Sequence, residues 1–183
     1  MFLLVALIAT VAQSQLVAHR DQAVYIQGSR LGDLKTCNKV ASFRWALTHR
    51  APVLGCRLIS DGSKAIVMSW VTTTIPHTHH IPLFLIKVRL ADRSTGFFLD
   101  SDVVPFLSAG TIVRVTNGNN CTQAALGSVV AQRPGVENDV TVKLADGKLA
   151  AVNHWNLRLT DGVPVNVWTP QDFVMVRAAG WCQ

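Results

Sequence analysis

The chain has 183 residues and a formal net charge of +6, with 17 Lys or Arg against 11 Asp or Glu. Its length is sufficient for a buried core in one domain or in two small ones. It contains a single Glu, Glu137, and no Gly-x-Ser-x-Gly, His-Glu-x-x-His or Gly-rich phosphate loop. This composition argues against the hydrolases and nucleotide-binding enzymes that those motifs identify, so we predict no catalytic residue.

The first 14 residues predict a cleavable signal peptide. They carry no charged side chain, and Phe2 to Ala12 is apolar except for Thr10. Such a run is typical of the hydrophobic segment of a signal peptide, and it is shorter than the roughly 20 apolar residues of a transmembrane helix. Ala12 and Ser14 place small residues before a cut after Ser14, so the mature chain is expected to start at Gln15. We expect export, with no transmembrane segment after signal removal.

Residues 15–50 are predicted to form a basic N-terminal extension. From Gln15 to Lys64, eight Lys or Arg face three Asp, which gives a local charge of +5. Such a charge can meet an acidic glycan, an anionic membrane or nucleic acid. The alternative is an ordinary solvated surface, because the charges are dispersed. One short helix is expected at Ser42–Thr48, ending before Pro52, since the residue preceding a proline disfavours the α region.

The rest of the chain is predicted to be mainly β. Short runs of β-branched and aromatic residues are separated by Asp-Gly and Asn-Gly pairs, which favour hairpin turns. The expected strands are Val53–Ile59, Ala65–Thr72, Leu83–Leu90, Gly96–Leu99, Thr111–Thr116, Gly127–Ala131, Asp139–Leu144, Leu149–Val152 and Val163–Trp168.

An internal repeat is the most informative pattern in the sequence. Ile86–Asp92 aligns without a gap on Val140–Asp146, and the next strand and a closing apolar pair follow in the same order after a one-residue deletion. In both segments the apolar residues recur at every second position. This alternation predicts two strands with one buried face each.

The order of strand patterns and turns over Gly110–Leu159 resembles a Tudor-like or SH3-like barrel repeat. It reads Gly-x-x-Val-x-Val, Asn-Gly, Gly-Ser-Val-Val, Val-Thr-Val-Lys-Leu-Ala-Asp-Gly and Asn-Leu-Arg-Leu, and Ala51–Phe106 resembles a more divergent copy. The resemblance implies two tandem barrels, residues 51–107 and 108–165, followed by a C-terminal tail, 166–183. It implies a fold rather than an activity, because small barrels host many unrelated functions.

The resemblance also directs attention to aromatic residues. Tudor-type readers of methylated side chains surround a cation with several rings. The second copy has no aromatic residue in the corresponding turn, so no cage carries over residue by residue. Trp70, Phe97, Phe98 and Trp155 are the candidate binding residues, and the alternative is that these rings pack in the core.

His77 and His79 are candidate metal ligands. Two residues apart in an extended segment, their side chains point to the same side and can offer two nitrogens to Zn²⁺ or Cu²⁺, whereas His80 points away. A structural zinc site takes four ligands and a catalytic one three, and the sequence identifies no third. The alternative is an exposed loop of pH-sensitive histidines. We predict no resident cofactor.

The four cysteines predict two disulfides in an oxidising compartment. Sequence alone leaves three connectivities open. We expect Cys37 to bridge to Cys182 and fasten the two ends of the chain, and Cys56 to bridge to Cys121 and join the barrels. Asn120-Cys121-Thr122 matches the N-glycosylation sequon, so Asn120 is a candidate glycan acceptor.

These features together predict a secreted, non-enzymatic binding or structural module. Its partner is expected to be an extracellular protein or an acidic glycan, recognised through the tandem barrels. One alternative is a basic binder of polyanions or nucleic acid. Another is a small metal-dependent enzyme centred on His77 and His79.

Overall fold

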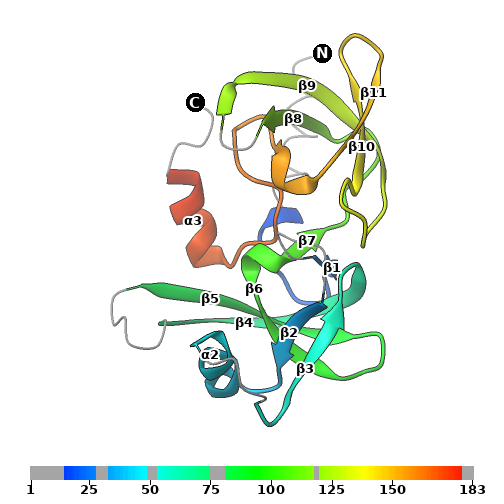
Figure 1. Cartoon of the computed structure of the whole chain (residues 1–183). Coiled ribbons are helices and arrows are strands. Elements are labelled where there is room, and N and C mark those ends of the chain that lie inside the picture. Colours follow the sequence, from blue (N-terminus) through cyan, green and yellow to red (C-terminus); the bar gives the residue numbers. More distant parts are fainter. Residues whose placement is uncertain (1–14, 28–32, 49–52, 75–80, 118–119, 179–183) are drawn as a thin grey trace.

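The computed structural model describes residues 15–27, 33–48, 53–74, 81–117 and 120–178. The protein is mainly β, as predicted, with two sheets that follow one another along the chain (Figure 1). The predicted signal peptide lies outside the described residues. None of the helices within the described ranges has the length and apolar character needed to cross a bilayer.

The first sheet has seven strands in the order β3-β2-β6-β5-β4-β1-β7. Helix α2, Val40–Thr48, lies between β2 and β3 in the chain. Segment 15–50, predicted as an extension, instead supplies α2 and two strands of this sheet. The strands are β1 (Ala23–Ile26), β2 (Asp33–Cys37), β3 (Cys56–Ser60), β4 (Ser63–Thr74), β5 (Pro82–Leu90), β6 (Thr95–Leu99) and β7 (Val103–Pro105).

The second sheet has five strands in the order β11-β10-β9-β8-β12. Short 3₁₀ turns precede the last strand of each sheet: η1, Asp100–Asp102, and η2, His154–Asn156. Helix α3, Pro170–Ala178, follows the second sheet. The strands are β8 (Ile112–Asn117), β9 (Asn120–Gln132), β10 (Val140–Leu144), β11 (Leu149–Val152) and β12 (Leu157–Arg158).

One five-strand order occurs in both sheets. The order β7-β1-β4-β5-β6 in the first corresponds to β12-β8-β9-β10-β11 in the second, and η1 and η2 hold the same place. The aligned segments Ile86–Asp92 and Val140–Asp146 fall on the equivalent strands β5 and β10. The elements β2, α2 and β3 are an insertion between the first two strands of the first copy.

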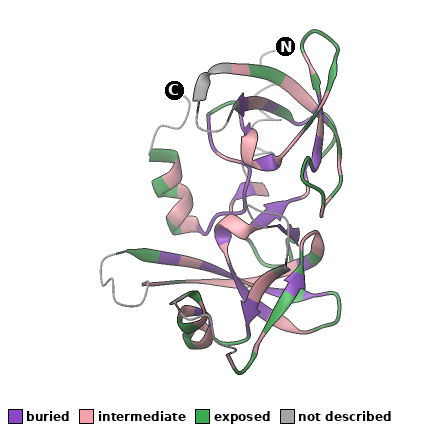
Figure 2. Cartoon of the chain, viewed as in Figure 1, coloured by how far each residue is buried: buried purple, intermediate pink, exposed green. Residues whose placement is uncertain are grey.

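Burial on β5 and β10 alternates as the sequence predicts (Figure 2). Ile86, Val88 and Leu90 are buried, as are Val140 and Val142. The first set belongs to the core of the first sheet and the second set to the core of the second sheet. Each copy therefore has its own apolar centre.

The hairpin turn after β5 is repeated after β10 in detail. Arg93 donates its backbone N–H to the carbonyl of Leu90 at 2.9 Å, and Gly147 donates to Leu144 at 2.9 Å. Arg93 has φ of 65° and Gly147 has φ of 85°. The same left-handed position is therefore occupied by glycine in one copy and by arginine in the other.

Replacing Arg93 with glycine is expected to stabilise the protein by about 0.5–1 kcal/mol. The left-handed region costs a residue with a Cβ about 1–2 kcal/mol, and part of that gain is offset by the greater entropy of glycine in the unfolded chain. Urea unfolding measures the difference. Arg89→Gly, at an exposed extended position of the same hairpin, is the matched control and should destabilise by about 0.5–1 kcal/mol. If both variants were stabilised, or both destabilised, the left-handed backbone at Arg93 would be contradicted.

The run before α3, predicted as a strand, connects the two sheets instead. Val163–Trp168, predicted as a strand, forms only isolated bridges, Arg158 with Pro164 and Val17 with Trp168. Its apolar side chains are buried and divide between the two cores: Val167 packs in the first, and Trp168 in the second. The prediction of a strand there is wrong because this run crosses from one core to the other.

Helix α3 was not predicted, although its start carries a recognisable signal. Thr169 precedes Pro170, and its hydroxyl accepts the backbone N–H of Asp172 at 3.2 Å. Ser or Thr as the N-cap followed by proline at the first helical position is a typical helix start. Phe173 of α3 is partly buried against the core of the second sheet.

The disulfide found is Cys37–Cys56, so the expected pairings Cys37–Cys182 and Cys56–Cys121 are wrong. The register explains the result. Cys37 and Cys56 lie directly opposite each other on the antiparallel strands β2 and β3, with their Cα atoms 4.0 Å apart. The side chain of Cys121 and all of Cys182 lie outside the described residues.

Removing this bridge by the double substitution Cys37→Ala and Cys56→Ala is expected to cost about 3 kcal/mol. The bridge closes a loop with a sequence separation of 19 residues, and the loss of chain entropy in the unfolded state has about this magnitude. Urea unfolding of both proteins, with and without reductant, measures the effect. The variant should be insensitive to reductant at this site, and an unchanged unfolding midpoint without reductant would contradict the expectation.

Candidate functional site

The structure divides the four aromatic residues considered for binding among three places. Phe98 is 1% exposed in the core of the first sheet, where Trp70 packs against it. Phe97 points to the opposite face of β6 and packs under α2. Trp155 lies in η2 of the second sheet, with its ring centroid 5.3 Å from that of His154. The rings of β6 are therefore core residues on two different faces.

The remaining predicted site residues fall at the margin of the described structure. His77 and His79 lie outside the described residues, and Asn120 begins β9 with its side chain also outside them. Within the described ranges, no group of three or more His, Cys, Asp or Glu side chains is arranged to hold a metal ion.

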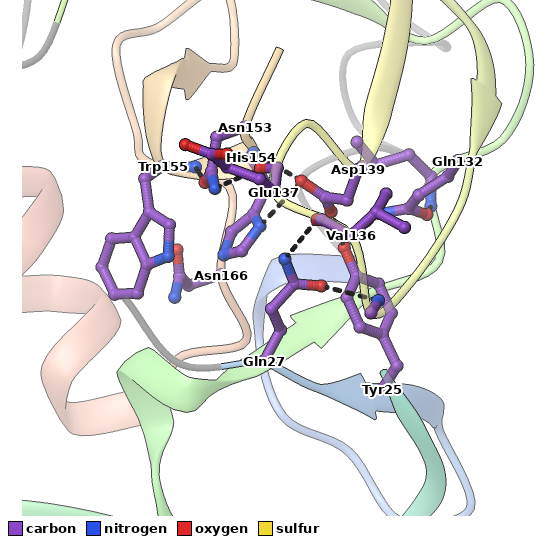
Figure 3. A network of polar contacts seen from close by, with 12 residues as sticks. Tyr25, Gln27, Gln132, Val136, Glu137, Asp139, Asn153, His154, Trp155 and Asn166 are labelled. Carbon is purple, nitrogen blue, oxygen red and sulfur yellow. Dashed lines mark hydrogen bonds and ion pairs between the residues drawn. The ribbon is translucent and has the colours of Figure 1, made fainter. Parts of the chain in front are cut away.

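A buried polar network joins the two sheets (Figure 3). The Tyr25 hydroxyl on β1 donates to a carboxylate oxygen of Asp139, which directly precedes β10. The other oxygen of Asp139 accepts the backbone N–H of His154 at 2.9 Å and lies 3.1 Å from His154 Nδ1. Tyr25 and His154 are 0% exposed and Asp139 is 1% exposed.

Two glutamines extend this network along the junction. Gln132 on β9 donates to the Tyr25 hydroxyl at 2.7 Å, and its side-chain oxygen accepts the N–H of Leu107 at 2.8 Å. Gln27, which follows β1, donates to the carbonyl of Val136 at 3.1 Å (Figure 3). Gln27 also accepts the backbone N–H of Gly135 at 3.2 Å, so the two glutamines fix the sheets to each other at several points.

A close approach of two glycines lies at the same junction. Gly62, with φ of 78°, lies so near Gly135 that a Cβ on Gly62 would be 2.6 Å from the Cα of Gly135. Gly62 also donates its N–H to the carbonyl of Ile26 at 2.7 Å. The turn after β3 and the loop before β10 therefore meet backbone to backbone.

The residue types of the network also occur in active sites. Here, however, they are buried between the two sheets. An Asp–His contact orients a histidine in many hydrolases, where the imidazole faces a nucleophile and the substrate. Here burial and the neighbouring Asp139 raise the pKa of Tyr25, so its hydroxyl stays protonated and donates. A substrate would reach these side chains only if the two sheets separated. The arrangement supplies attachment between the sheets.

A pair of carboxyl groups ties α3 to the first sheet. Burial, together with the hydrogen bond to Asp172 on α3, raises the pKa of Asp100 in η1 to about 9. Asp100 is 5% exposed, and its other oxygen accepts the N–H of Ser101 at 2.9 Å. At neutral pH the Asp100 carboxyl beside Asp172 is therefore protonated.

The accessible candidate is the Arg57 cleft, formed by two shallow pockets that meet at Arg57 on β3. One has a volume of about 250 Å³ and lies between β3, the start of β4 and the turn after β5. The other, of about 300 Å³, lies beside the disulfide. Arg57, 44% exposed, contacts Asp92 at 2.7 Å and donates to the Ser94 hydroxyl. The hydrogen bond from Arg57 and those from Ser94 hold the pKa of Asp92 below its usual range.

Sequence reasoning missed Tyr25 and Asp139 of the buried network, and Arg57 and Asp92 of the Arg57 cleft. Asp139 carries one faint signal, a carboxylate immediately before an alternating apolar strand, and Asp92 belongs to the repeated Leu-Ala-Asp turn. Tyr25 and Arg57 carry none, because their partners lie 114 and 35 residues away in the sequence.

Comparison of the sequence with known proteins gives no match from which the function of either site could be inferred. No protein-family model and no curated protein sequence matches the chain. The rigid junction and the Arg57 cleft are therefore the two features from which a function can be argued.

Proposed function

We propose that this protein is a secreted, non-enzymatic binding module in which two SH3-like, Tudor-like barrels hold an extracellular macromolecule. The shared five-strand order, with a 3₁₀ turn before the last strand of each copy, supports the barrel assignment. The size of each copy suits a small barrel that limits exposed sheet edges.

The contrast between the buried network and the open cleft carries the proposal. The reactive residue types Tyr25, Asp139 and His154 are enclosed and bonded to one another. Arg57, with its accessible guanidinium, lies instead in an open cleft. A joint that fixes two units in advance lowers the entropic cost of binding one large partner, which is how a rigid double module gains affinity.

Two features support an extracellular location. The N-terminal 14 residues have the pattern of a removable signal peptide. The Cys37–Cys56 bridge requires an oxidising compartment for its persistence in most organisms. Amino-terminal sequencing of the secreted protein tests this part, with Gln15 as the expected first residue.

The binding function is tested by retention on an array of extracellular-matrix proteins and acidic glycans. The mature chain from Gln15 to Gln183, produced in an oxidising host, should be retained by a subset of these at an ionic strength of about 0.15 M. Arg57→Ala should weaken retention, whereas Arg177→Ala, at an exposed position of α3, should not. A protein that no ligand retains and that turns over a substrate would overturn the proposal.

Binding of a polyanion is the second candidate, and the burial of carboxylates favours it. Asp100 and Asp139 are buried, as is Arg158, so these three side chains contribute little to the surface that a large partner meets. Because two carboxylates and one guanidinium are removed, the accessible surface is slightly more basic than the net charge of the whole sequence. Affinity for a sulfated polysaccharide or for nucleic acid should then fall steeply between about 50 and 200 mM salt. A salt-independent affinity would exclude this candidate.

A further inference from the structure

Strand β3 forms an open edge of the first sheet. Among the described strands it pairs with β2 alone. The Cα atoms of Cys37 and Cys56 are 4.0 Å apart, the short separation of a pair that exchanges no ladder hydrogen bonds. Because bonded and non-bonded pairs alternate, the backbone groups of Leu58 and Ser60 point away from β2, and the Ser60 carbonyl there accepts the Ser63 hydroxyl at 2.6 Å. Leu58 is also 59% exposed, so this edge is accessible.

A pocket for one side chain lies next to this edge. It is lined by Arg57 and Ile59 of β3, by Ser63 and Lys64 of β4, and by residues 90–92 after β5, and its volume is about 250 Å³. Pockets for whole small molecules have volumes of about 300–1,000 Å³. This pocket is therefore suited to part of a larger ligand.

The charges around the pocket favour an acidic group. Asp92 is the one carboxylate in its lining, and it already accepts hydrogen bonds from Arg57 and from the backbone and hydroxyl of Ser94. Lys64 is exposed, and so is Arg93 beside Asp92. The lining therefore keeps positive charge for an incoming anion.

We infer that the β3 edge binds an extended peptide, which adds a strand beside β3 and places an Asp or Glu side chain in the pocket between Arg57 and Lys64. In this mode of recognition, main-chain hydrogen bonds provide affinity and pockets for alternate side chains provide specificity. The inference rests on the proposed function, for which it names the class of partner: a protein with an accessible, extended acidic segment.

A positional-scanning library of capped peptides tests the inference. Peptides of about eight residues match the length of a strand, and binding to the mature protein can be followed by fluorescence polarisation. One position should prefer Asp or Glu over Asn or Gln by about tenfold. The selected peptide should slow hydrogen exchange at the Leu58 amide. A library without binders, or binding that leaves this amide unprotected, would overturn the inference.

Two substitutions at position 58 separate backbone pairing from side-chain contact. Leu58→Pro removes the outward N–H without removing a hydrogen bond to β2, and proline is tolerated on edge strands. It should weaken binding of the selected peptide by about tenfold or more, while Leu58→Ala should change it by less than about threefold. Thermal unfolding checks that both variants remain folded. Equal affinity of the two variants would contradict strand addition.

Charge reversal tests the pocket and distinguishes this inference from the broader proposal. Lys64→Glu should remove the acidic preference of the peptide library, whereas Lys148→Glu, 81% exposed on the second sheet, should leave it unchanged. If the mature protein is retained on the array but Leu58→Pro and Lys64→Glu are retained equally well, the peptide inference fails and the binding function stands. Retention of both variants by a sulfated glycan would assign that function to another surface.

Discussion

Asp139→Ala is expected to lower the free energy of unfolding by about 3–5 kcal/mol, because it removes the one carboxylate that accepts hydrogen bonds from three buried donors. The substitution leaves the Tyr25 hydroxyl and both the backbone N–H and Nδ1 of His154 without their acceptor. All of these groups are buried, so water cannot replace Asp139 without opening the junction. Because a domain of this size is typically stable by only about 5–15 kcal/mol, the loss is a large fraction of the total. Urea unfolding provides the measurement.

Two control variants make the origin of this loss clear. Glu137→Ala changes an exposed carboxylate in the same loop and should alter stability by less than about 0.5 kcal/mol. Tyr25→Phe keeps the Asp139 contacts to His154 and removes one hydroxyl, so a loss of about 1–3 kcal/mol is expected. If Asp139→Ala and Glu137→Ala unfold at the same urea concentration, the network does not hold the sheets together.

The Asp100→Asn variant is expected to become more stable than the unsubstituted protein as the pH rises from 5 to 8. The pKa of Asp100 is raised to about 9, whereas an aspartate in the unfolded chain has a value of about 3.9. The folded protein therefore binds one more proton than the unfolded chain between these values. The stability contributed by the protonated carboxyl is complete below about pH 4 and is lost as the pH rises through about 9.

Asparagine removes this titration and places a neutral amide, which has a donor, beside Asp172. The difference in unfolding free energy between variant and unsubstituted protein should grow by about 1.4 kcal/mol per pH unit, an upper limit for one group. Urea unfolding at several pH values measures it. Asp102→Asn is the matched control: burial and Asp61 raise the pKa of Asp102 to about 6, so its advantage should level off above that pH. If the difference in unfolding free energy between Asp100→Asn and the unsubstituted protein stayed constant from pH 5 to 8, the raised pKa of Asp100 would be contradicted.

The parts of the fold that the sequence predicted are those with local signals. Strands β5 and β10 have one buried face, and that face appears in the sequence as alternation of apolar residues. The turns after them carry Asp92 and Asp146, whose side chains accept the N–H two residues later at 3.0 Å in both copies. Alternation and turn chemistry depend on neighbouring residues, so a single sequence is sufficient to identify them.

The parts that were missed depend on contacts between distant segments. Strand β1 has four residues and β12 has two, too few to show a period, and both exist because they pair with strands far along the chain. The disulfide follows from the register of β2 against β3, which no spacing of cysteines reveals. The contact between Tyr25 and Asp139 could not be predicted either, because nothing in the local sequence indicates that Asp139 is buried.

The contact of Gly62 with Gly135 provides a means of testing whether the partner needs both halves of the molecule at once. A methyl group at position 62 acts as a wedge, since it must displace backbone rather than a flexible side chain. Gly62→Ala would push the two loops apart and also strain the turn, because Gly62 has φ of 78°, so thermal unfolding must first show that the variant is folded. A ligand that spans both halves would then lose affinity, whereas one confined to a single half would bind as before.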